Sequence, residues 1–129
     1  MKFLIVISVL AFALTAADDD DGGFVKIHNR GLYVAIFSVS YDLNGKPVSK
    51  SSGPFWLFHH RTIEIPGGAT NIRVKAEEYW FFKLKATIFE EQYDKPGSHC
   101  YKVYGVTFAP SWKKKEFLCA HISFGSNDD

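Results

Sequence analysis

Residues 33–51 read YVAIFSVSYDLNGKPVSKS, and this stretch decides the fold. Apolar side chains occupy every second position in its first half, namely Tyr33, Ala35, Phe37, Val39 and Tyr41. Alternation with period two is typical of a β-strand that turns one face toward a core. Asn44-Gly45, placed between two such segments, is the strongest short signal of a β-hairpin. The stretch therefore predicts two antiparallel strands joined by a tight turn.

The same pattern extends over the body of the chain. All five prolines fall in predicted turns, and Pro66-Gly67-Gly68 supplies the positive φ that a second reversal needs. Gly105 falls inside a strand and indicates a bulge or a close backbone approach. Strands are expected near residues 24–29, 32–41, 46–51, 55–65, 70–79, 84–92, 100–108 and 115–124. Seven or eight short strands separated by turns predict an all-β sandwich.

Two kinds of connection alternate along the chain. Four are apolar: Arg30-Gly-Leu-Tyr33, Pro54-Phe-Trp-Leu-Phe58, Tyr79-Trp-Phe-Phe-Lys-Leu84 and Thr107-Phe-Ala-Pro-Ser-Trp112. Three are polar: Asp42–Pro47, Pro66–Ala69 and Asp94–Ser98. If the strands run up and down, successive connections lie at opposite ends of the molecule, so the apolar ones share one end. Apolar side chains gathered at loop tips indicate a membrane or a hydrophobic partner.

The N-terminal residues have the pattern of a targeting signal. An apolar run from Phe3 to Leu14 follows Met1-Lys2 and ends in Thr15-Ala-Ala17 before a run of aspartates. The run is too short for a spanning helix, which needs roughly 20 apolar residues, and its small terminal residues fit a signal-peptidase site. We therefore expect residues 1–17 to be a signal peptide and the mature protein to be secreted and extracellular.

The remaining chain has the length of one domain. We expect an acidic, disordered tail at residues 18–23, a sandwich domain at 24–124 and a C-terminal tail at 125–129. Between residues 22 and 127 the chain has fourteen basic and eight acidic residues, which suits an anionic surface. The basic residues are dispersed, and no dense stripe indicates nucleic acid. Asp18–Asp21 have no spacing known from calcium loops and are expected to be solvated.

Cys100 and Cys119 are the two cysteines of the chain. In an oxidising compartment, an even pair in a small domain favours a disulfide over a metal site or a catalytic thiol. We expect the bridge to join the last two strands.

Four short elements follow one another in an order and spacing known from one protein family. They are Gly31-Leu-Tyr-Val-Ala35, the alternation Phe37, Val39, Tyr41, Asp42, the element Ile65-Pro66 with Ala69, Asn71 and Ile72, and Tyr104-Gly-Val-Thr-Phe-Ala-Pro110. From Gly31 to Pro110 the chain resembles the C-terminal membrane-binding domain of the cholesterol-dependent, or thiol-activated, cytolysins. The resemblance implies an immunoglobulin-like antiparallel β-sandwich of seven or eight strands whose loops at one end contact the bilayer.

The chain departs from the family where the family meets the membrane. The Trp-rich undecapeptide of the family is replaced by Glu78-Tyr-Trp-Phe-Phe-Lys-Leu-Lys-Ala86, which is about two residues shorter and lacks the Cys, the Trp pair and the Arg. The sterol-recognising Thr-Leu pair aligns with Thr107-Phe108, which keeps the hydroxyl and changes the aliphatic side chain to a ring. The sequence contains no counterpart of the pore-forming domains, so we expect no lysis by this chain alone.

The candidate contact residues are the large apolar side chains of the four connections and one threonine. They are Leu32, Trp56, Phe58, Trp80, Phe81, Phe82, Thr107 and Phe108. Neighbouring strand residues point to opposite faces, so Trp80, Phe81 and Phe82 cannot all enter one core. Ordinary core packing is the alternative for each ring. The cations beside the rings either reach lipid phosphates or form a solvated rim; they are Arg30, Arg61, Lys83 and Lys85.

The sequence gives no argument for an enzyme, a cofactor or a metal. His59-His60 are adjacent and would point to opposite faces, with no further ligand at a recognisable spacing. No nucleophile motif occurs, and Glu77-Glu78 and Glu90-Glu91 are expected at solvated strand edges.

We expect a secreted, non-enzymatic module that binds a lipid membrane surface or sterol through its apolar connections. Two alternatives use the same rings. One is a protein-interaction module, such as a defence or toxin-associated factor, and the other is a glycan-binding module, because exposed Trp also stacks on sugars.

Overall fold

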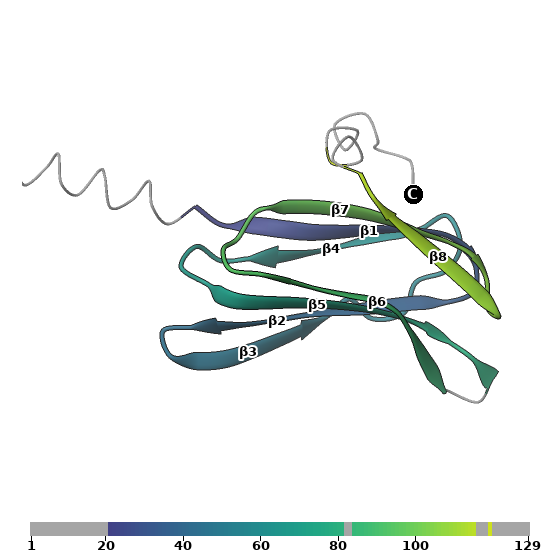
Figure 1. Cartoon of the computed structure of the whole chain (residues 1–129), viewed down its shortest axis with the longest axis horizontal. Coiled ribbons are helices and arrows are strands. Elements are labelled where there is room, and N and C mark those ends of the chain that lie inside the picture. Colours follow the sequence, from purple (N-terminus) through teal and green to yellow (C-terminus); the bar gives the residue numbers. More distant parts are fainter. Residues whose placement is uncertain (1–20, 82–83, 116–118, 120–129) are drawn as a thin grey trace, which may run out of the picture.

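The computed structural model describes residues 21–81, 84–115 and 119, and within them the chain forms eight β-strands. Their bounds are β1 Gly23–Leu32, β2 Ala35–Leu43, β3 Lys46–Ser51, β4 His60–Ile65, β5 Thr70–Tyr79, β6 Lys85–Tyr93, β7 Ser98–Val106 and β8 Ala109–Lys114. The strands make two four-stranded sheets with the orders β4-β1-β7-β8 and β3-β2-β5-β6. The two sheets lie face to face, as Figure 1 shows. The predicted all-β sandwich is confirmed.

Strand direction alternates along the chain. Every pairing is antiparallel except that of β1 with β7, which is parallel. Odd-numbered strands therefore run toward one end of the sandwich and even-numbered strands run away from it. The connections after β1, β3, β5 and β7 share that end, at the right of Figure 1, and the polar turns share the other. β1 and β7 are parallel because both are odd-numbered and lie side by side in one sheet.

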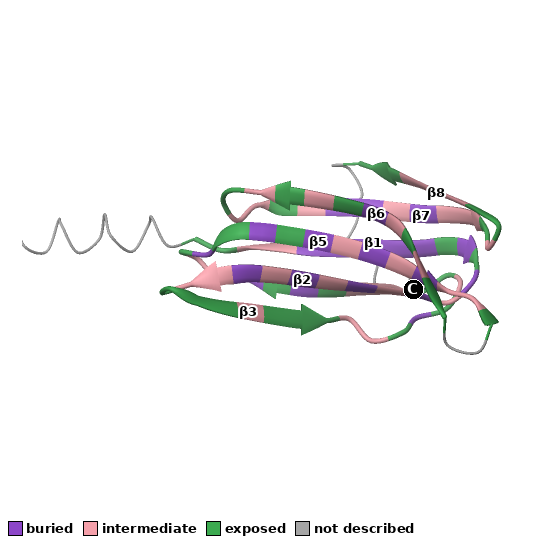
Figure 2. Cartoon of the chain, turned by 60° about the horizontal axis from the view of Figure 1, so that its bottom comes forward, coloured by how far each residue is buried: buried purple, intermediate pink, exposed green. Residues whose placement is uncertain are grey.

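The core lies between the sheets and is filled from alternate strand positions. In β2 and β5 the burial alternates residue by residue, as the colours of Figure 2 show. The core residues of β1, β2, β4 and β5 are Val25, Ile27, Ala35, Phe37, Val39, Tyr41, Ile63, Ile65, Ile72, Val74 and Ala76. Phe89 of β6 and Tyr101 of β7 close the core with stacked rings whose centroids are 4.7 Å apart. The period-two reading of residues 33–41 is confirmed.

Three turns depend on positive φ. Asn44 and Gly45 have φ values of 54° and 79°, as a tight hairpin between β2 and β3 requires. Gly68 has φ 88° in the reversal between β4 and β5. Gly105 has φ 92°, and a Cβ placed on it would lie 2.4 Å from the carbonyl oxygen of Ala109. The predicted close backbone approach at Gly105 is confirmed.

Several predicted boundaries were wrong. The strand expected at 55–65 begins at His60, and only Phe55 pairs before it, in an isolated bridge with Ala35. The apolar connection expected at 107–112 is a short turn followed by β8, because residues 109–114 pair with β7. Gly23 belongs to β1 and not to the acidic tail. The last predicted strand, 115–124, lies outside the described residues apart from Lys115 and Cys119.

Other predictions fall wholly or mostly on residues that are not described. These are the signal peptide at 1–17, residues 18–20 of the acidic tail, the C-terminal tail at 125–129, Phe82 and Lys83. They stay predictions.

Cys100 and Cys119 form a disulfide with their Cα atoms 5.5 Å apart, which confirms the predicted pairing. Cys100 lies in β7, whereas Cys119 follows the end of β8. The bridge therefore joins β7 to the segment beyond β8. We had expected it to join the last two strands, and that part of the prediction was wrong.

Candidate binding surface

The four connections at the end reached by the odd-numbered strands form one surface. It consists of residues 32–35, 52–59, 79–81 with 84, and 106–109, and it is hereafter the apolar pole. In the part of the chain that the structure describes, every exposed large hydrophobic side chain lies there. These side chains are Leu32, Trp56, Phe58, Phe81, Leu84, Val106 and Phe108, with exposed fractions between 43% and 75%. A cluster of this kind marks a site of interaction.

The connection between β3 and β4 divides its rings between the core and solvent. Phe55 is buried, because its backbone pairs with Ala35 in both directions, at 2.8 and 2.9 Å, and its ring packs edge-on against Phe37. Trp56 and Phe58 point outward. Phe58 adopts φ 72°, which is rare for a bulky residue, and its N–H donates to Asn29 O at 2.7 Å. The backbone around Phe58 is thus fixed in a strained form that exposes the ring.

The connection between β5 and β6 is a tight loop that presents Phe81 and Leu84. Trp80 N–H donates to Leu84 O at 2.6 Å, and Leu84 N–H donates to Phe81 O at 3.2 Å. Trp80 itself is half-buried, with its ring edge-on to those of Phe81 and Phe108 at centroid distances of 6.2 and 5.4 Å. Trp80 therefore supports exposed rings of two different connections.

The hairpin between β7 and β8 carries the most exposed ring. Phe108 is 75% exposed, and Thr107 beside it is half-buried. The turn is short because Val106 pairs with Ala109. Thr107 and Phe108 thus lie at the tip of the hairpin, and Trp80 contacts Phe108 from the neighbouring connection.

Buried hydrogen bonds hold the connections in place. The side chain of Asn29 donates to Tyr33 O at 2.8 Å and Phe55 O at 3.1 Å, and it accepts from Gly31 N–H at 2.8 Å. Tyr33 OH donates to Tyr104 O at 2.9 Å, and burial raises the pKa of Tyr33 well above its usual value. These bonds link β1 and the connection after it to the connection after β3 and to β7. The pole is therefore organised before any ligand arrives.

Glu78 lies beneath the pole and is 1% exposed, so the prediction of a solvated edge was wrong for it. It occupies an inward position of β5, two residues beyond Ala76. Its Oε2 accepts from Trp80 Nε1 at 3.2 Å, and its Oε1 is buried without a hydrogen-bond partner. Burial raises the pKa of Glu78, and the bond from Trp80 lowers it by a smaller amount.

The predicted basic rim is realised only in part. Arg30 is exposed, with its guanidinium carbon 5.9 Å from the centroid of the Phe58 ring. Arg61 is half-buried over Phe55 and donates to the backbone oxygen of His60. Lys85 lies 4.0 Å from a carboxylate oxygen of Glu77. Of the predicted cations that the structure describes, Arg30 is thus the one that lies beside an exposed ring of the pole.

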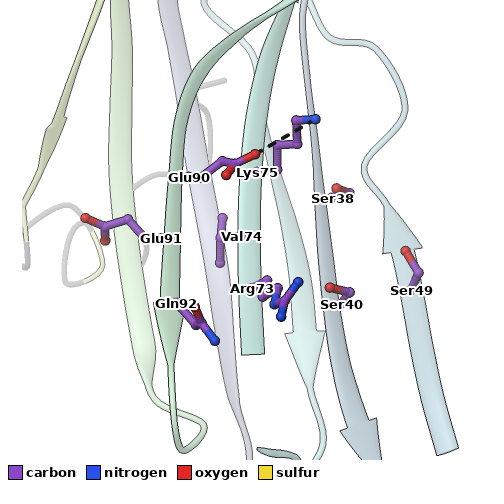
Figure 3. Close-up of a pocket in the computed structure, with 9 residues that line it drawn as sticks. All are labelled: Ser38, Ser40, Ser49, Arg73, Val74, Lys75, Glu90, Glu91 and Gln92. Carbon is purple, nitrogen blue, oxygen red and sulfur yellow. Dashed lines mark ion pairs between the residues drawn. The ribbon is translucent and has the colours of Figure 1, made fainter. Parts of the chain in front are cut away.

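A second surface is the shallow polar groove on the outer face of the β3-β2-β5-β6 sheet. Serines of β2 and β3 line one side and charged side chains of β5 and β6 the other (Figure 3). Lys75 pairs with Glu90 at 3.9 Å and with Glu77 at 3.8 Å. The cations and carboxylates of this face largely neutralise one another.

The described residues contain no group of three His, Cys, Asp or Glu side chains that could hold a metal. His59 lies near Leu57 O, at 3.2 Å from Nδ1, and the ring of His60 faces that of His28. Among the described residues, no helix is long and apolar enough to cross a bilayer.

Sequence reasoning missed two exposed members of the pole, Leu84 and Val106. Leu84 was inside a predicted apolar connection but was also the first residue of a predicted strand. Val106 was expected in a strand ending at residue 108, whereas the strand ends at Val106 itself. The end of the alternation at Gly105 was the signal that could have placed it.

Comparisons with known proteins agree with this architecture. The family model of the thiol-activated cytolysin beta sandwich domain matches residues 24–111. The structure of the membrane-binding domain of pneumolysin is 22% identical, with a TM-score of 0.56, over 72% of this chain and 95% of that one. No match was found among curated proteins.

Whole toxins are similar over one domain. Listeriolysin O is 22% identical with a TM-score of 0.56, and 72% of this chain covers 22% of that one. Suilysin from Streptococcus suis is 19% identical with a TM-score of 0.56, over 71% of this chain and 22% of that one. The chain thus spans less than a quarter of the length of these toxins. Because the family match covers most of the chain and agrees with its eight-stranded sandwich, the chain belongs to the thiol-activated cytolysin beta sandwich domain family.

Proposed function

We propose that this chain is a secreted, non-enzymatic module that binds lipid membranes by inserting the apolar pole. The observation that carries the proposal is the gathering of every exposed large hydrophobic side chain of the described residues at one end of the sandwich. Burial of a large apolar side chain contributes on the order of 1.5–3 kcal/mol before ordering costs. Three or four such side chains suffice to hold a small protein reversibly at a bilayer.

The organisation of the pole supports insertion. The hydrogen bonds of Asn29 and Tyr33 fix the connections, so little conformational entropy is lost on binding. Trp56 joins an apolar body to a polar indole N–H, a combination suited to the interfacial zone of a bilayer. The family relationship points the same way, since one similar structure is that of the membrane-binding domain of pneumolysin.

Co-sedimentation with liposomes tests the proposal. The wild-type protein is expected to pellet with phosphatidylcholine–cholesterol vesicles, and Trp56→Ser/Phe58→Ser to lose binding by roughly tenfold or more, since two exposed side chains no longer enter the bilayer. Pro47→Ser is the matched control, because Pro47 is an exposed apolar residue on β3 near the opposite end.

Absence of binding to vesicles of every composition would overturn the proposal. The pole would then serve one of the alternatives, a protein partner or a glycan. Sedimentation equilibrium and a glycan array separate these two.

We also propose that the chain alone forms no pore, since it corresponds to one domain of much longer toxins. Dye-loaded vesicles should retain their dye at protein concentrations that saturate binding. Release that follows the binding curve would contradict this part of the proposal.

A further inference from the structure

The outer face of the β4-β1-β7-β8 sheet carries a cluster of cations next to the apolar pole. Tyr101 and Val103 of β7 are fully buried, so Lys102 and Tyr104 between and after them point outward. Register partners on adjacent strands share a face, which places Lys113 of β8 beside Lys102 and Arg30 of β1 beside Tyr104. Arg30, Lys102, Tyr104 and Lys113 are hereafter the basic face.

The cations of the basic face converge on rings. Lys102 Nζ and Lys113 Nζ lie 5.2 and 5.7 Å from the centroid of the Tyr104 ring. Arg30 lies over Phe58 of the pole. Two lysines placed directly opposite one another across β7 and β8 repel each other unless an anion lies between them.

The described residues supply no such anion. None of Arg30, Lys102 and Lys113 forms an ion pair with a carboxylate in the described ranges. Among those ranges, the one carboxylate on the outer face of this sheet is Glu64 of β4, which pairs with Phe24 near the opposite end of β1. In the polar groove on the other sheet, by contrast, Lys75 pairs with Glu90 (Figure 3) and also with Glu77.

The basic face also lies at a defined distance from the pole. Leu32 and Val106, both exposed, form the register pair two positions beyond Arg30 and Tyr104 along β1 and β7. Two strand residues span about 7 Å. The headgroup region of a bilayer is about 5–7 Å thick on each side of the hydrocarbon core. With Leu32 and Val106 at the hydrocarbon boundary, Arg30 reaches the depth of the lipid phosphates.

We propose that the basic face binds the phosphates of anionic phospholipids while the apolar pole enters the bilayer. This inference rests on the proposed function and specifies its lipid. The molecule then tilts so that Arg30, Lys102 and Lys113 face the headgroups and the polar groove of the other sheet faces water. Lys102 and Lys113 were not among the cations expected from the sequence, since their neighbour relation depends on strand register.

The experiment compares vesicles of phosphatidylcholine and cholesterol with and without phosphatidylserine, at low and physiological salt. Wild-type protein is expected to bind the anionic vesicles more tightly, with a gain that falls as salt rises. Lys102→Gln/Lys113→Gln should lose roughly thirtyfold in affinity for anionic vesicles and little for neutral ones, because each of the two lysines contributes about 1 kcal/mol near an anionic leaflet. Arg30→Gln should act in the same direction.

Lys46→Gln/Lys95→Gln is the matched control, since it removes the same charge from exposed positions at the opposite end. Thermal unfolding checks that all variants fold. Equal binding to neutral and anionic vesicles, or equal effects of the test and control pairs, would overturn the inference and leave the proposed function intact. Loss of all vesicle binding in the wild type would overturn both.

A final arm separates a lipid headgroup from a free anion. Inorganic phosphate is titrated against the wild-type protein while thermal unfolding is followed. Stabilisation by millimolar phosphate, abolished in Lys102→Gln/Lys113→Gln and unaccompanied by a preference for anionic vesicles, would replace the lipid by a soluble anion and overturn the inference.

Discussion

At the scale of single residues, Glu78 is a carboxyl group that the fold places among apolar side chains. In the unfolded chain a Glu ionises near its ordinary pKa of 4.5, whereas burial raises the pKa in the folded state. Between these two values the unfolded state has lost its proton and the folded state keeps it. The free energy of unfolding therefore falls as pH rises through this window, and it stays lower above it.

We expect Glu78→Gln to stabilise the protein at pH 7.5 relative to wild type, and to do so less at pH 4. The amide is neutral at both values and keeps an oxygen that accepts from Trp80 Nε1. Thermal unfolding at the two pH values measures the difference, with the exposed Glu64→Gln as control. A difference between variant and wild type that is the same at both pH values would contradict the argument.

Phe108 and Thr107 allow the contribution of a ring to be compared with that of a hydroxyl. Phe108 is the most exposed large side chain of the pole, whereas Thr107 is half-buried beside it. Phe108→Ala should weaken vesicle binding several-fold and Thr107→Ala less, because insertion depends on apolar area. Titrations against vesicles of increasing cholesterol content test this order. A sharp cholesterol threshold, with no binding below it, would instead favour specific sterol recognition.

At the scale of elements, the β7–β8 hairpin depends on the backbone of Gly105. Its φ of 92° is unfavourable for a residue with a Cβ, and that Cβ would meet the carbonyl oxygen of Ala109 at 2.4 Å. Both partners belong to the backbone of one hairpin, so neither can move without breaking its pairing.

Gly105→Ala should therefore lower the free energy of unfolding by about 1–3 kcal/mol and weaken vesicle binding by displacing Phe108. Gly45→Ala is the matched control, since Gly45 also has positive φ, at 79°, but open space around its Cβ. Urea unfolding of the two variants separates the cost of the contact with the Ala109 carbonyl oxygen from the cost of a positive φ in a residue with a Cβ. Equal losses would show that the contact with Ala109 relaxes freely.

At the scale of the whole molecule, the disulfide ties the segment beyond β8 to β7. It encloses a loop of 19 residues, for which the chain-entropy model gives about 3 kcal/mol of stabilisation. We expect Cys100→Ala/Cys119→Ala to lower the free energy of unfolding by about that amount while the sandwich remains folded. Urea unfolding of wild type and variant, with and without reductant, provides the measurement. Reductant should affect the wild type alone; an equal effect on the variant would point to another cause.

The two sheets also give the molecule two different faces. The β3-β2-β5-β6 sheet carries lysines and carboxylates in ion pairs, while the cations of the basic face have no carboxylate partner among the described residues. This asymmetry arises from the strand order β4-β1-β7-β8, which brings Arg30, Lys102 and Lys113 together from three strands.

The sequence by itself determined the strand positions from β1 to β7, apart from the start of β4, and the end at which each connection lies. Alternation in Tyr33–Tyr41 and the Asn44-Gly45 turn are local properties, because strand periodicity and turn conformation depend on neighbouring residues. The location of the apolar connections followed from counting reversals: strands that alternate in direction bring every second connection to the same end. The cysteine pairing followed from the presence of two cysteines in a chain that we expect to be secreted into an oxidising compartment.

Only the tertiary structure decided which side chains of those connections face water. Phe55 is buried and Trp56 exposed because Phe55 pairs with Ala35 across 20 residues of sequence, a contact that no local period encodes. The burial of Glu78, the support of Phe108 by Trp80 and the assembly of the basic face likewise depend on strand order and register. Periodicity fixes the direction of a side chain relative to its own strand, whereas packing between strands distant in sequence decides what that side chain meets.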